Sequence, residues 1–262
     1  MQMVYETLKL KVTENLLIVT LNRPEVRNAI NFQMMQELKQ LWSDLYIDIN
    51  GIRCVILTGA GDKAFCAGAD LKERNNLDVK TWLMQHAVLE QAMLAMVDCP
   101  VPVIAAVNGP AFGGGLELIL GSDFVYAVDT ATFAFPEGKL GIIPGAMGTQ
   151  NLPVACGLAR AKEICFTGGA FNAEEAKAWG VVNKICSAEN LLSEVLKTAN
   201  VIINNAPLAI TQLKKSLNAT RANLITGYQF EIEAYKKLLP TDDRMEGISA
   251  FNEKRKPNFK GC

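Results

Sequence analysis

The chain has 262 residues, half of them hydrophobic, and its 27 acidic and 26 basic side chains leave a formal net charge of −1. This length and composition can bury a large core, and the near-neutral charge disfavours nucleic acid or an anionic membrane as a partner. The apolar runs are too short to span a bilayer, and the N-terminus resembles neither a signal nor a transit peptide, so we expect a cytoplasmic protein.

The predicted strands and helices alternate through the first two thirds of the chain. Alternating or continuous apolar runs predict strands at Val4–Val12, Asn15–Asn22, Cys54–Thr58, Val103–Val107, Phe124–Val128, Thr132–Phe135 and Val181–Ile185. Helices are predicted from a cap at Asn31 to about Ile49 and over Val79–Asp98, and the chain is mostly helical from Leu158 onward. This order predicts an α/β fold with a helical C-terminal part.

The cysteines and the single histidine narrow the possible chemistry. Seven cysteines without a Cys-x-x-Cys pair are typical of free thiols in a reducing compartment. Cys66 could be a nucleophile, but only His86 could activate it, and packing in a helix is the simpler interpretation of His86. One histidine also argues against a Ser-His-Asp triad and a multi-histidine metal site, so we expect no metal.

The segment AFGGGLELIL (111–120) places three glycines directly before an apolar helix that contains Glu117. Glycines at a helix N-terminus let a ligand approach free N–H donors, so the loop could hold a phosphate or a polarised carbonyl oxygen. The dinucleotide and P-loop fingerprints are both missing, which weakens the phosphate interpretation. Taken alone, Glu117 could simply complement the helix dipole.

Two more loops also follow predicted strands. KAFCAGADLKE (63–73) exposes backbone at Ala67–Ala69, although Asp70 could merely cap a turn in a plain connection. FPEGKLGIIPGAMGTQ (135–150) carries Glu137, which could equally be a solvated turn residue. Together the three loops offer two sets of backbone donors and two carboxylates, and that combination suits the addition of water to a polarised double bond.

The motifs AFCAGADLKE, PVIAAVNGPAFGGGLEL and PEGKLGIIPGAMGTQ, in this order and spacing, resemble the crotonase (enoyl-CoA hydratase/isomerase) superfamily over essentially the whole chain. Within this superfamily, the segments ADLKER and KLGIIPG are most similar to the methylglutaconyl-CoA hydratase branch. The resemblance implies a spiral of ββα units over residues 1–195 and a helical trimerisation region over 196–262. It also implies a homotrimer or homohexamer that acts on acyl-CoA thioesters without a separate cofactor, in fatty-acid or branched amino-acid breakdown.

The resemblance also assigns roles to single residues. Ala69 and Gly114 match the amides of the oxyanion hole, and Glu117 and Glu137 match the catalytic acids of hydratases. Gly145 matches a backbone contact to the attacking water. The positions that match CoA contacts are Arg27, Ala29, Ala67 and Lys72, with Phe251 and Lys254 reaching the CoA of a neighbouring subunit.

Departures from the family pattern leave the shape of the acyl pocket open, and two other functions remain as alternatives. Met147 stands where these enzymes usually carry glycine, Asn151 where arginine is usual, and Pro110–Phe112 borders the oxyanion loop, so the acyl pocket is expected to differ in shape. A Δ3,Δ2-enoyl-CoA isomerase is the enzymatic alternative, although isomerases often keep only one of the two acids. An RNA-binding or non-catalytic member of the same scaffold is the alternative of another class.

Overall fold

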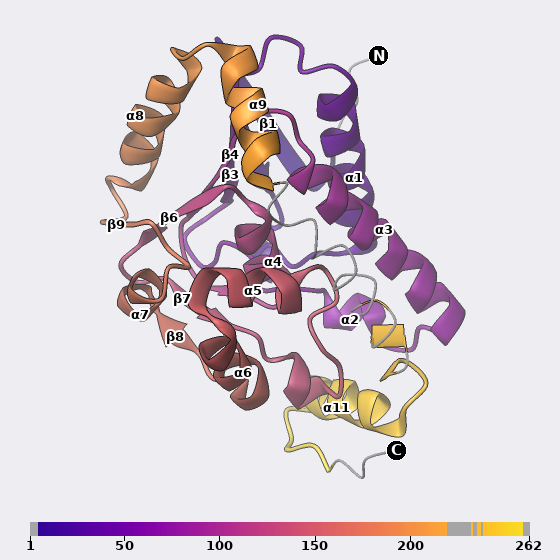
Figure 1. Ribbon diagram of the computed structural model, residues 1–262. Helices are drawn as coiled ribbons and strands as arrows, with labels where there is room; N and C mark the ends of the chain where they lie inside the picture. The colour runs from indigo at the N-terminus through magenta and orange to yellow at the C-terminus, as the bar shows by residue number, and fades with distance from the viewer. Residues whose placement is uncertain (1–4, 219–231, 233–234, 237, 259–262) are drawn as a thin grey trace.

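The computed structural model describes residues 5–218, 232, 235–236 and 238–258 (Figure 1). Its largest sheet has six strands in the order β1-β2-β3-β4-β6-β9, and every neighbouring pair except β1 and β2 is parallel. The bounds of these strands are β1 Leu8–Thr13, β2 Leu16–Leu21, β3 Cys54–Gly59, β4 Val103–Val107, β6 Phe124–Val128 and β9 Lys184–Cys186. The apolar run of β4 is buried throughout, as expected of a central parallel strand that is covered on both faces.

A second sheet of three short strands lies next to the first. It contains β5 (Ala111–Phe112), β7 (Thr132–Ala134) and β8 (Phe171–Asn172), in that order. β5 runs parallel to β7, which brings the segment before the Gly113 turn alongside the end of β7. Sequence patterns predict β7 but not β5 or β8, because two residues are too few to show a period.

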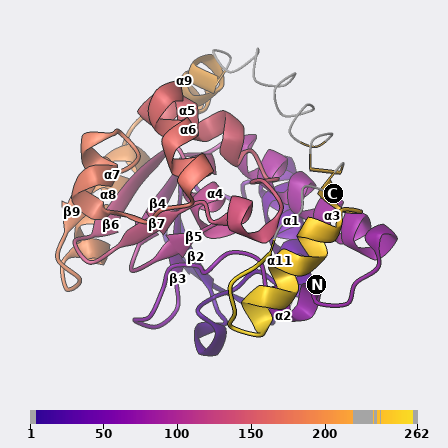
Figure 2. The ribbon, with the colours of Figure 1, turned by 90° about the horizontal axis from the view of Figure 1, so that it is seen from below.

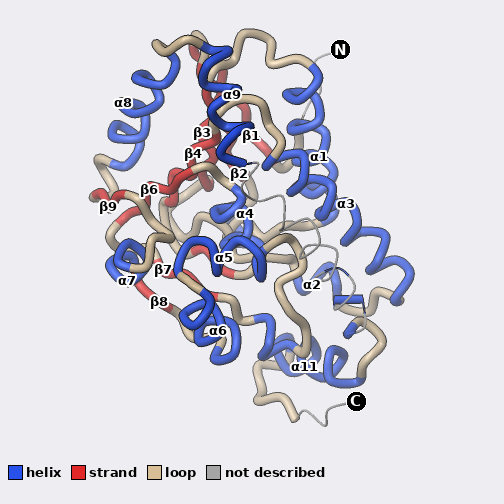
Figure 3. The backbone as a smooth tube through the Cα atoms, in the orientation of Figure 1, coloured by secondary structure: helices blue, strands red, loops and turns tan. Residues whose placement is uncertain are grey.

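Helices surround the two sheets (Figure 3). Their bounds are α1 Phe32–Ile47, α2 Leu71–Arg74, α3 Val79–Val97, α4 Gly114–Gly121, α5 Gly148–Cys156, α6 Leu158–Thr167, α7 Ala173–Ala178, α8 Leu191–Ile203, α9 Pro207–Asn218 and α11 Asp242–Asn252, with short 3-10 turns η1 Pro24–Val26 and η2 Glu137–Leu140. α8 packs across β3, β4 and β6, and the paired helices α1 and α3 lie on the other side of the sheet (Figure 1). The α/β prediction is therefore confirmed.

Two predicted caps agree well with the structure, and two predicted strand starts are displaced. The first strand begins at Leu8 and not at Val4, because the Glu6 and Thr7 amides donate to the Glu37 carboxylate and not to a neighbouring strand. Asn31 caps α1, its side chain accepting a hydrogen bond from the Met34 amide at 3.0 Å. Asp70 caps α2 by accepting from the Glu73 amide at 3.3 Å. The predicted strand Val181–Ile185 begins later, at Lys184, because Val181 and Val182 donate their amides to the Ala176 carbonyl at the end of α7.

The C-terminal part is tied to the body by buried contacts. On α9, Lys214 is 8% exposed, and its ammonium lies 2.8 Å from the Asp123 carboxylate and 3.0 Å from the Val101 carbonyl. α11 lies against η2 and α2, as Figures 1 and 2 show from two directions. The predicted division of the chain at residue 195 falls inside α8 and stays a prediction.

Candidate active site

The loop that precedes α2 is held against the segment 27–30 by backbone hydrogen bonds. The Ala67 amide donates to the Arg27 carbonyl at 3.0 Å, the Ile30 amide donates to Gly68 at 2.8 Å, and the Asp70 amide donates to Ile30 at 2.9 Å. This pattern uses the loop amides of Ala67 and Asp70 but not that of Ala69, which lies between them. Within the described residues, the Ala69 N–H has no acceptor, and the residue is partly exposed.

The glycines before α4 bring a second amide to the same place. Gly113 has φ +51° and donates its N–H to the Ala134 carbonyl at 2.9 Å. Gly114 begins the helix, so its N–H has no partner within the helix, and no other described residue accepts it. A Cβ built on Gly114 would lie 3.9 Å from the Ala69 nitrogen, so the two open amides are neighbours. The predicted oxyanion pair is thus brought together.

The third glycine lets α4 approach the Ala69 loop closely. A Cβ on Gly115 would lie 2.3 Å from the Cys66 carbonyl oxygen.

We expect Gly115→Ala to force the two loops apart and to lower the free energy of unfolding by about 3 kcal/mol. Thermal unfolding measures this effect. The matched control is Gly138→Ala, whose added Cβ would meet nothing closer than 3.6 Å; equal melting temperatures for the two variants would contradict the close approach.

Glu117 lies one turn into α4 and is fixed by the third loop. Its side chain is 4% exposed. One carboxylate oxygen, Oε1, accepts hydrogen bonds from the Ala146 amide at 2.7 Å and the Gly148 amide at 3.0 Å. The other oxygen, Oε2, lies 3.9 Å from the position that a Cβ on Gly114 would take. The carboxylate is therefore held beside the open Gly114 amide.

Glu137 reaches the same glycines from η2. Its side chain is 8% exposed, and its Oε1 lies 2.7 Å from the position of a Cβ on Gly113. The hydrogen bond from Gly113 to Ala134 at the end of β7 explains this proximity, because Glu137 follows β7 by only three residues. The two carboxylates predicted from separate loops therefore flank the same pair of glycines.

The carbonyl oxygen of Gly145 is taken by the single histidine. His86 on α3 is buried, and its Nε2 lies 2.9 Å from that oxygen. Burial, followed by the positive charge of Arg74, lowers the pKa of His86 to about 3, so the imidazole is neutral at physiological pH. The Gly145 amide donates to no described residue, so its N–H is the group available to a water molecule.

The residues predicted to contact CoA fall into two groups in the structure. Arg27, Ala29 and Ala67 lie in the paired segments beside Ala69, and Lys72 follows on α2 with an exposed side chain. Phe251 on α11 is 57% exposed, and Lys254 follows the helix with φ +56°. Exposed cationic and aromatic side chains of this kind suit a phosphate and an adenine ring.

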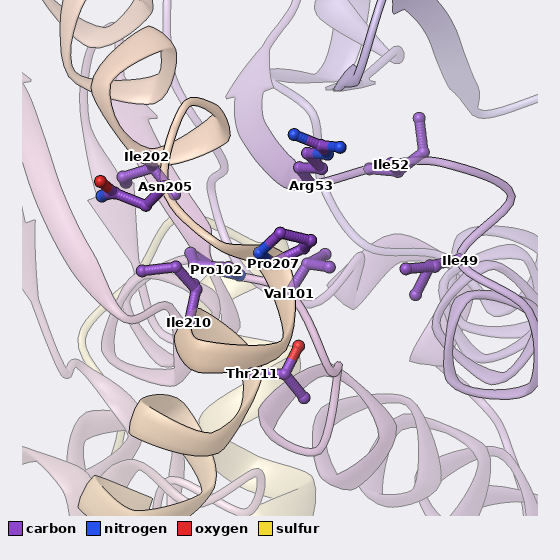
Figure 4. Close-up of a pocket in the computed structure, with 10 residues that line it drawn as sticks. All are labelled: Ile49, Ile52, Arg53, Val101, Pro102, Ile202, Asn205, Pro207, Ile210 and Thr211. Carbon is purple, nitrogen blue, oxygen red and sulfur yellow. The ribbon is translucent and has the colours of Figure 1, made fainter.

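Other sites are less suited to chemistry. Burial raises the pKa of the Cys66 thiol to about 12, which disfavours the thiolate that a nucleophile needs. A cavity of about 20 Å³ lies where α8 meets α9, lined by residues such as Pro102 and Ile210 (Figure 4), and has room for roughly one water. In the described part of the chain, no three acidic, histidine or cysteine side chains gather as a metal site, and no helix could cross a membrane.

Comparison with known proteins decides the family. The family model described as enoyl-CoA hydratase/isomerase matches residues 11–262. The chain belongs to this family. The predicted crotonase-superfamily membership is thereby confirmed, and with it the expectation that the protein is an enzyme.

Individual relatives of the hydratase/isomerase family match along nearly the whole chain. YngF of Bacillus subtilis, named as an enoyl-CoA hydratase/isomerase, is 44% identical over 95% of each chain. A crotonyl-CoA hydratase of Syntrophomonas wolfei is 38% identical over 98% of this chain and 99% of its own. The crystal structure of an enoyl-CoA hydratase from Bacillus anthracis has a TM-score of 0.80 at 39% identity, covering 98% of this chain and all of its own. The predicted crotonase-like fold is confirmed.

Two of the departures from the family pattern lie one turn apart at the start of α5. Met147 is the N-cap residue, has φ +74°, and is 7% exposed within the core. Left-handed backbone of this kind is strained for a side chain other than glycine, by about 1 kcal/mol. Asn151, in the first turn, is 4% exposed, and neither atom of its amide has a partner within the described residues.

Three functional groups escape sequence reasoning. The amides of Ala146 and Gly148, which hold Glu117, belong to residues whose side chains carry no signal of that role. The contact from His86 to Gly145 joins residues 59 positions apart. The structure explains the glycine at 148, since a Cβ there would lie 2.8 Å from Glu117 Oε1, but a glycine in the sequence does not by itself indicate that role.

Proposed function

We propose that this enzyme hydrates 2-enoyl-CoA thioesters to 3-hydroxyacyl-CoA. The observation that carries the proposal is the convergence of two open amides, from Ala69 and Gly114, with two buried carboxylates, Glu117 and Glu137, around one pair of glycines. Amides arranged in this way bind a carbonyl oxygen, and a pair of acids beside them can hold and deprotonate a water molecule.

The amides supply the electrostatic part of the reaction. When the thioester oxygen lies between the Ala69 and Gly114 N–H groups, the C=C bond becomes polarised and its β-carbon electrophilic. Attack by water moves an electron pair through the double bond onto that oxygen. Each preorganised donor stabilises the resulting enolate by about 3 kcal/mol, and the positive end of α4 adds to this effect.

The two glutamates complete the proton balance. Water lies between the carboxylates, and Glu117 takes one of its protons as the oxygen bonds to the β-carbon. Protonated Glu137 then gives its proton to the α-carbon as the enolate collapses to the thioester. Product release and return of a proton from Glu117 to Glu137 restore the starting state. In this proposal the Gly145 N–H, which donates to no described residue, orients the water.

An assay with paired substrates separates this activity from isomerisation. The hydratase consumes crotonyl-CoA, and the absorbance of the conjugated thioester falls. An isomerase instead converts a 3-enoyl-CoA to the conjugated 2-enoyl form, and that absorbance rises. A pure, folded sample that leaves crotonyl-CoA untouched but isomerises the 3-enoyl substrate would overturn the proposal. A panel of short, long, branched and carboxylated enoyl thioesters tests whether the enzyme prefers methylglutaconyl-CoA, as its resemblance to that branch suggests.

We further propose that the enzyme works as a trimer or a dimer of trimers in which α11 contributes to a neighbour's CoA site. Exposed Phe251 and Lys254 support this arrangement.

We expect Lys254→Ala to raise KM for the CoA substrate about tenfold, with kcat little changed, because it removes one charge-assisted contact to phosphate. Steady-state kinetics measures the separate effects on KM and kcat, with Lys197→Ala, a change at another exposed lysine, as control. An unchanged KM in Lys254→Ala would argue against the contact.

A further inference from the structure

The single histidine of the chain is packed directly behind the third loop. His86 is 3% exposed, and its ring stacks on Tyr235 with centroids 4.0 Å apart and an interplanar angle of 13°. A Cβ on Gly145 would lie 2.7 Å from His86 Cε1 and Nε2 and 2.8 Å from Tyr235 Cδ2. The imidazole and the phenol ring therefore press against the backbone at Gly145, where no side chain fits.

The contact fixes the tautomer of His86. A carbonyl oxygen only accepts, so the hydrogen between His86 Nε2 and the Gly145 oxygen belongs to Nε2. Nδ1 is buried without a hydrogen-bond partner among the described residues, which suits a lone pair better than an N–H group. The charged groups around the ring are Arg74, Lys236 and Glu90, the last with Oε1 3.4 Å from Nε2.

The Gly145 carbonyl and the Ala146 amide are the two ends of one peptide unit. That unit is planar, so an anchor on its oxygen also fixes the direction of its N–H. The Ala146 N–H donates to Glu117 Oε1 at 2.7 Å, the shorter of the two backbone bonds to that oxygen. A hydrogen bond to the carbonyl also polarises the peptide and strengthens the bond that its N–H donates.

We propose that His86 is a positioning residue whose Nε2–H holds the Gly145–Ala146 peptide so that the Ala146 N–H is aimed at the Glu117 carboxylate. Its catalytic consequence rests on the proposed hydratase function, whereas its structural part does not. His86 touches no reacting atom in this arrangement. This positioning role requires a hydrogen-bond donor at the position of Nε2, whereas a role in packing alone would require only a ring of similar size.

Two substitutions separate the donor from the ring. His86→Phe keeps a ring that can stack on Tyr235 but removes the donor, and His86→Gln places an amide nitrogen near the position of Nε2. We expect His86→Phe to lower kcat for crotonyl-CoA about 30-fold with KM within about threefold, because a small displacement of a catalytic group is costly. His86→Gln should recover most of kcat. A His86→Phe variant with wild-type kcat, or a His86→Gln variant equally impaired, would overturn the proposal.

A control variant and a measurement without turnover complete the test. Tyr235→Phe removes the hydroxyl that accepts from Trp82 Nε1 at 2.8 Å and from Arg74 but keeps the stacked ring, so it should lower the melting temperature and leave kcat unchanged. Because the chain has one histidine, nitrogen NMR of tag-free wild-type protein with isotope-labelled histidine gives the signals of His86 alone.

We expect the neutral Nε2–H tautomer at neutral pH. An imidazolium or an Nδ1–H tautomer would refute the proposal even if the variants fail to fold. A wild-type enzyme with the expected tautomer but no hydratase activity would instead refute the proposed function and leave the structural role of His86 standing.

Discussion

Glu117→Gln should lower kcat for crotonyl-CoA hydration by about 10³-fold, within the usual range for loss of a general base. The glutamine oxygen can still accept from the Ala146 and Gly148 amides, so the third loop should keep its position. The variant therefore removes the charge and basicity of the side chain with little change in shape. Steady-state kinetics and a thermal unfolding curve on the same sample measure both effects.

Glu37 provides the matched control for this change. It is also a buried glutamate, 6% exposed, whose carboxylate accepts backbone bonds from Glu6 at 2.7 Å and Thr7 at 2.9 Å. Hydrogen bonds from Thr7 and Gln33 outweigh burial and lower the pKa of Glu37. Glu37→Gln should reduce stability and leave kcat intact. Comparable kcat losses in the two variants would mean that Glu117 acts only through folding.

Gly114→Pro should lower kcat/KM by at least about 10²-fold, because proline has no N–H to donate to the thioester oxygen. Proline is well tolerated at the first position of a helix, and Gly114 occupies that position in α4. The added Cβ would lie 3.2 Å from the Cδ1 atom of Ile30, the end of a flexible side chain that can move aside. The fold should therefore survive the loss of the donor.

Gly114→Ala separates the donor from the added bulk, since it adds the same Cβ and keeps the N–H. We expect the alanine variant to retain at least about a tenth of the wild-type kcat/KM, which leaves a clear gap to the proline variant. If alanine and proline reduce kcat/KM equally, the site is sensitive to bulk at Gly114 and the amide has no special role. Circular dichroism checks that both variants fold.

Local signals predicted the parts of the fold that depend on neighbouring residues. The Asn31 cap and the apolar face behind it set α1, and the continuous apolar runs set β3, β4 and β6. The two-residue strands β5 and β8 were not predicted, because they exist only by pairing with β7. That pairing determines the site, since it delivers Glu137 to Gly113.

In the candidate site too, the sequence predicts the functional residues but not the contacts between distant segments that hold them in place. The loop sequences and the family resemblance predict that Ala69, Gly114, Glu117 and Glu137 share one site, and in the structure the open amides and the two carboxylates lie around Gly113 and Gly114. The groups that hold Glu117 in place are backbone amides, and the group that holds one of those amides is a histidine on another helix. Backbone donors leave no trace in residue identity, so only the folded chain reveals them.

Incubation of the wild-type enzyme with crotonyl-CoA in water labelled with heavy oxygen decides whether this site adds water across the double bond. We expect the product to be 3-hydroxybutyryl-CoA with one labelled oxygen, bound to the β-carbon. The Glu117→Gln variant should form it about 10³-fold more slowly under the same conditions. Crotonyl-CoA recovered unchanged and unlabelled from a folded preparation, or label found only in a hydrolysed thioester, would contradict the proposed hydratase.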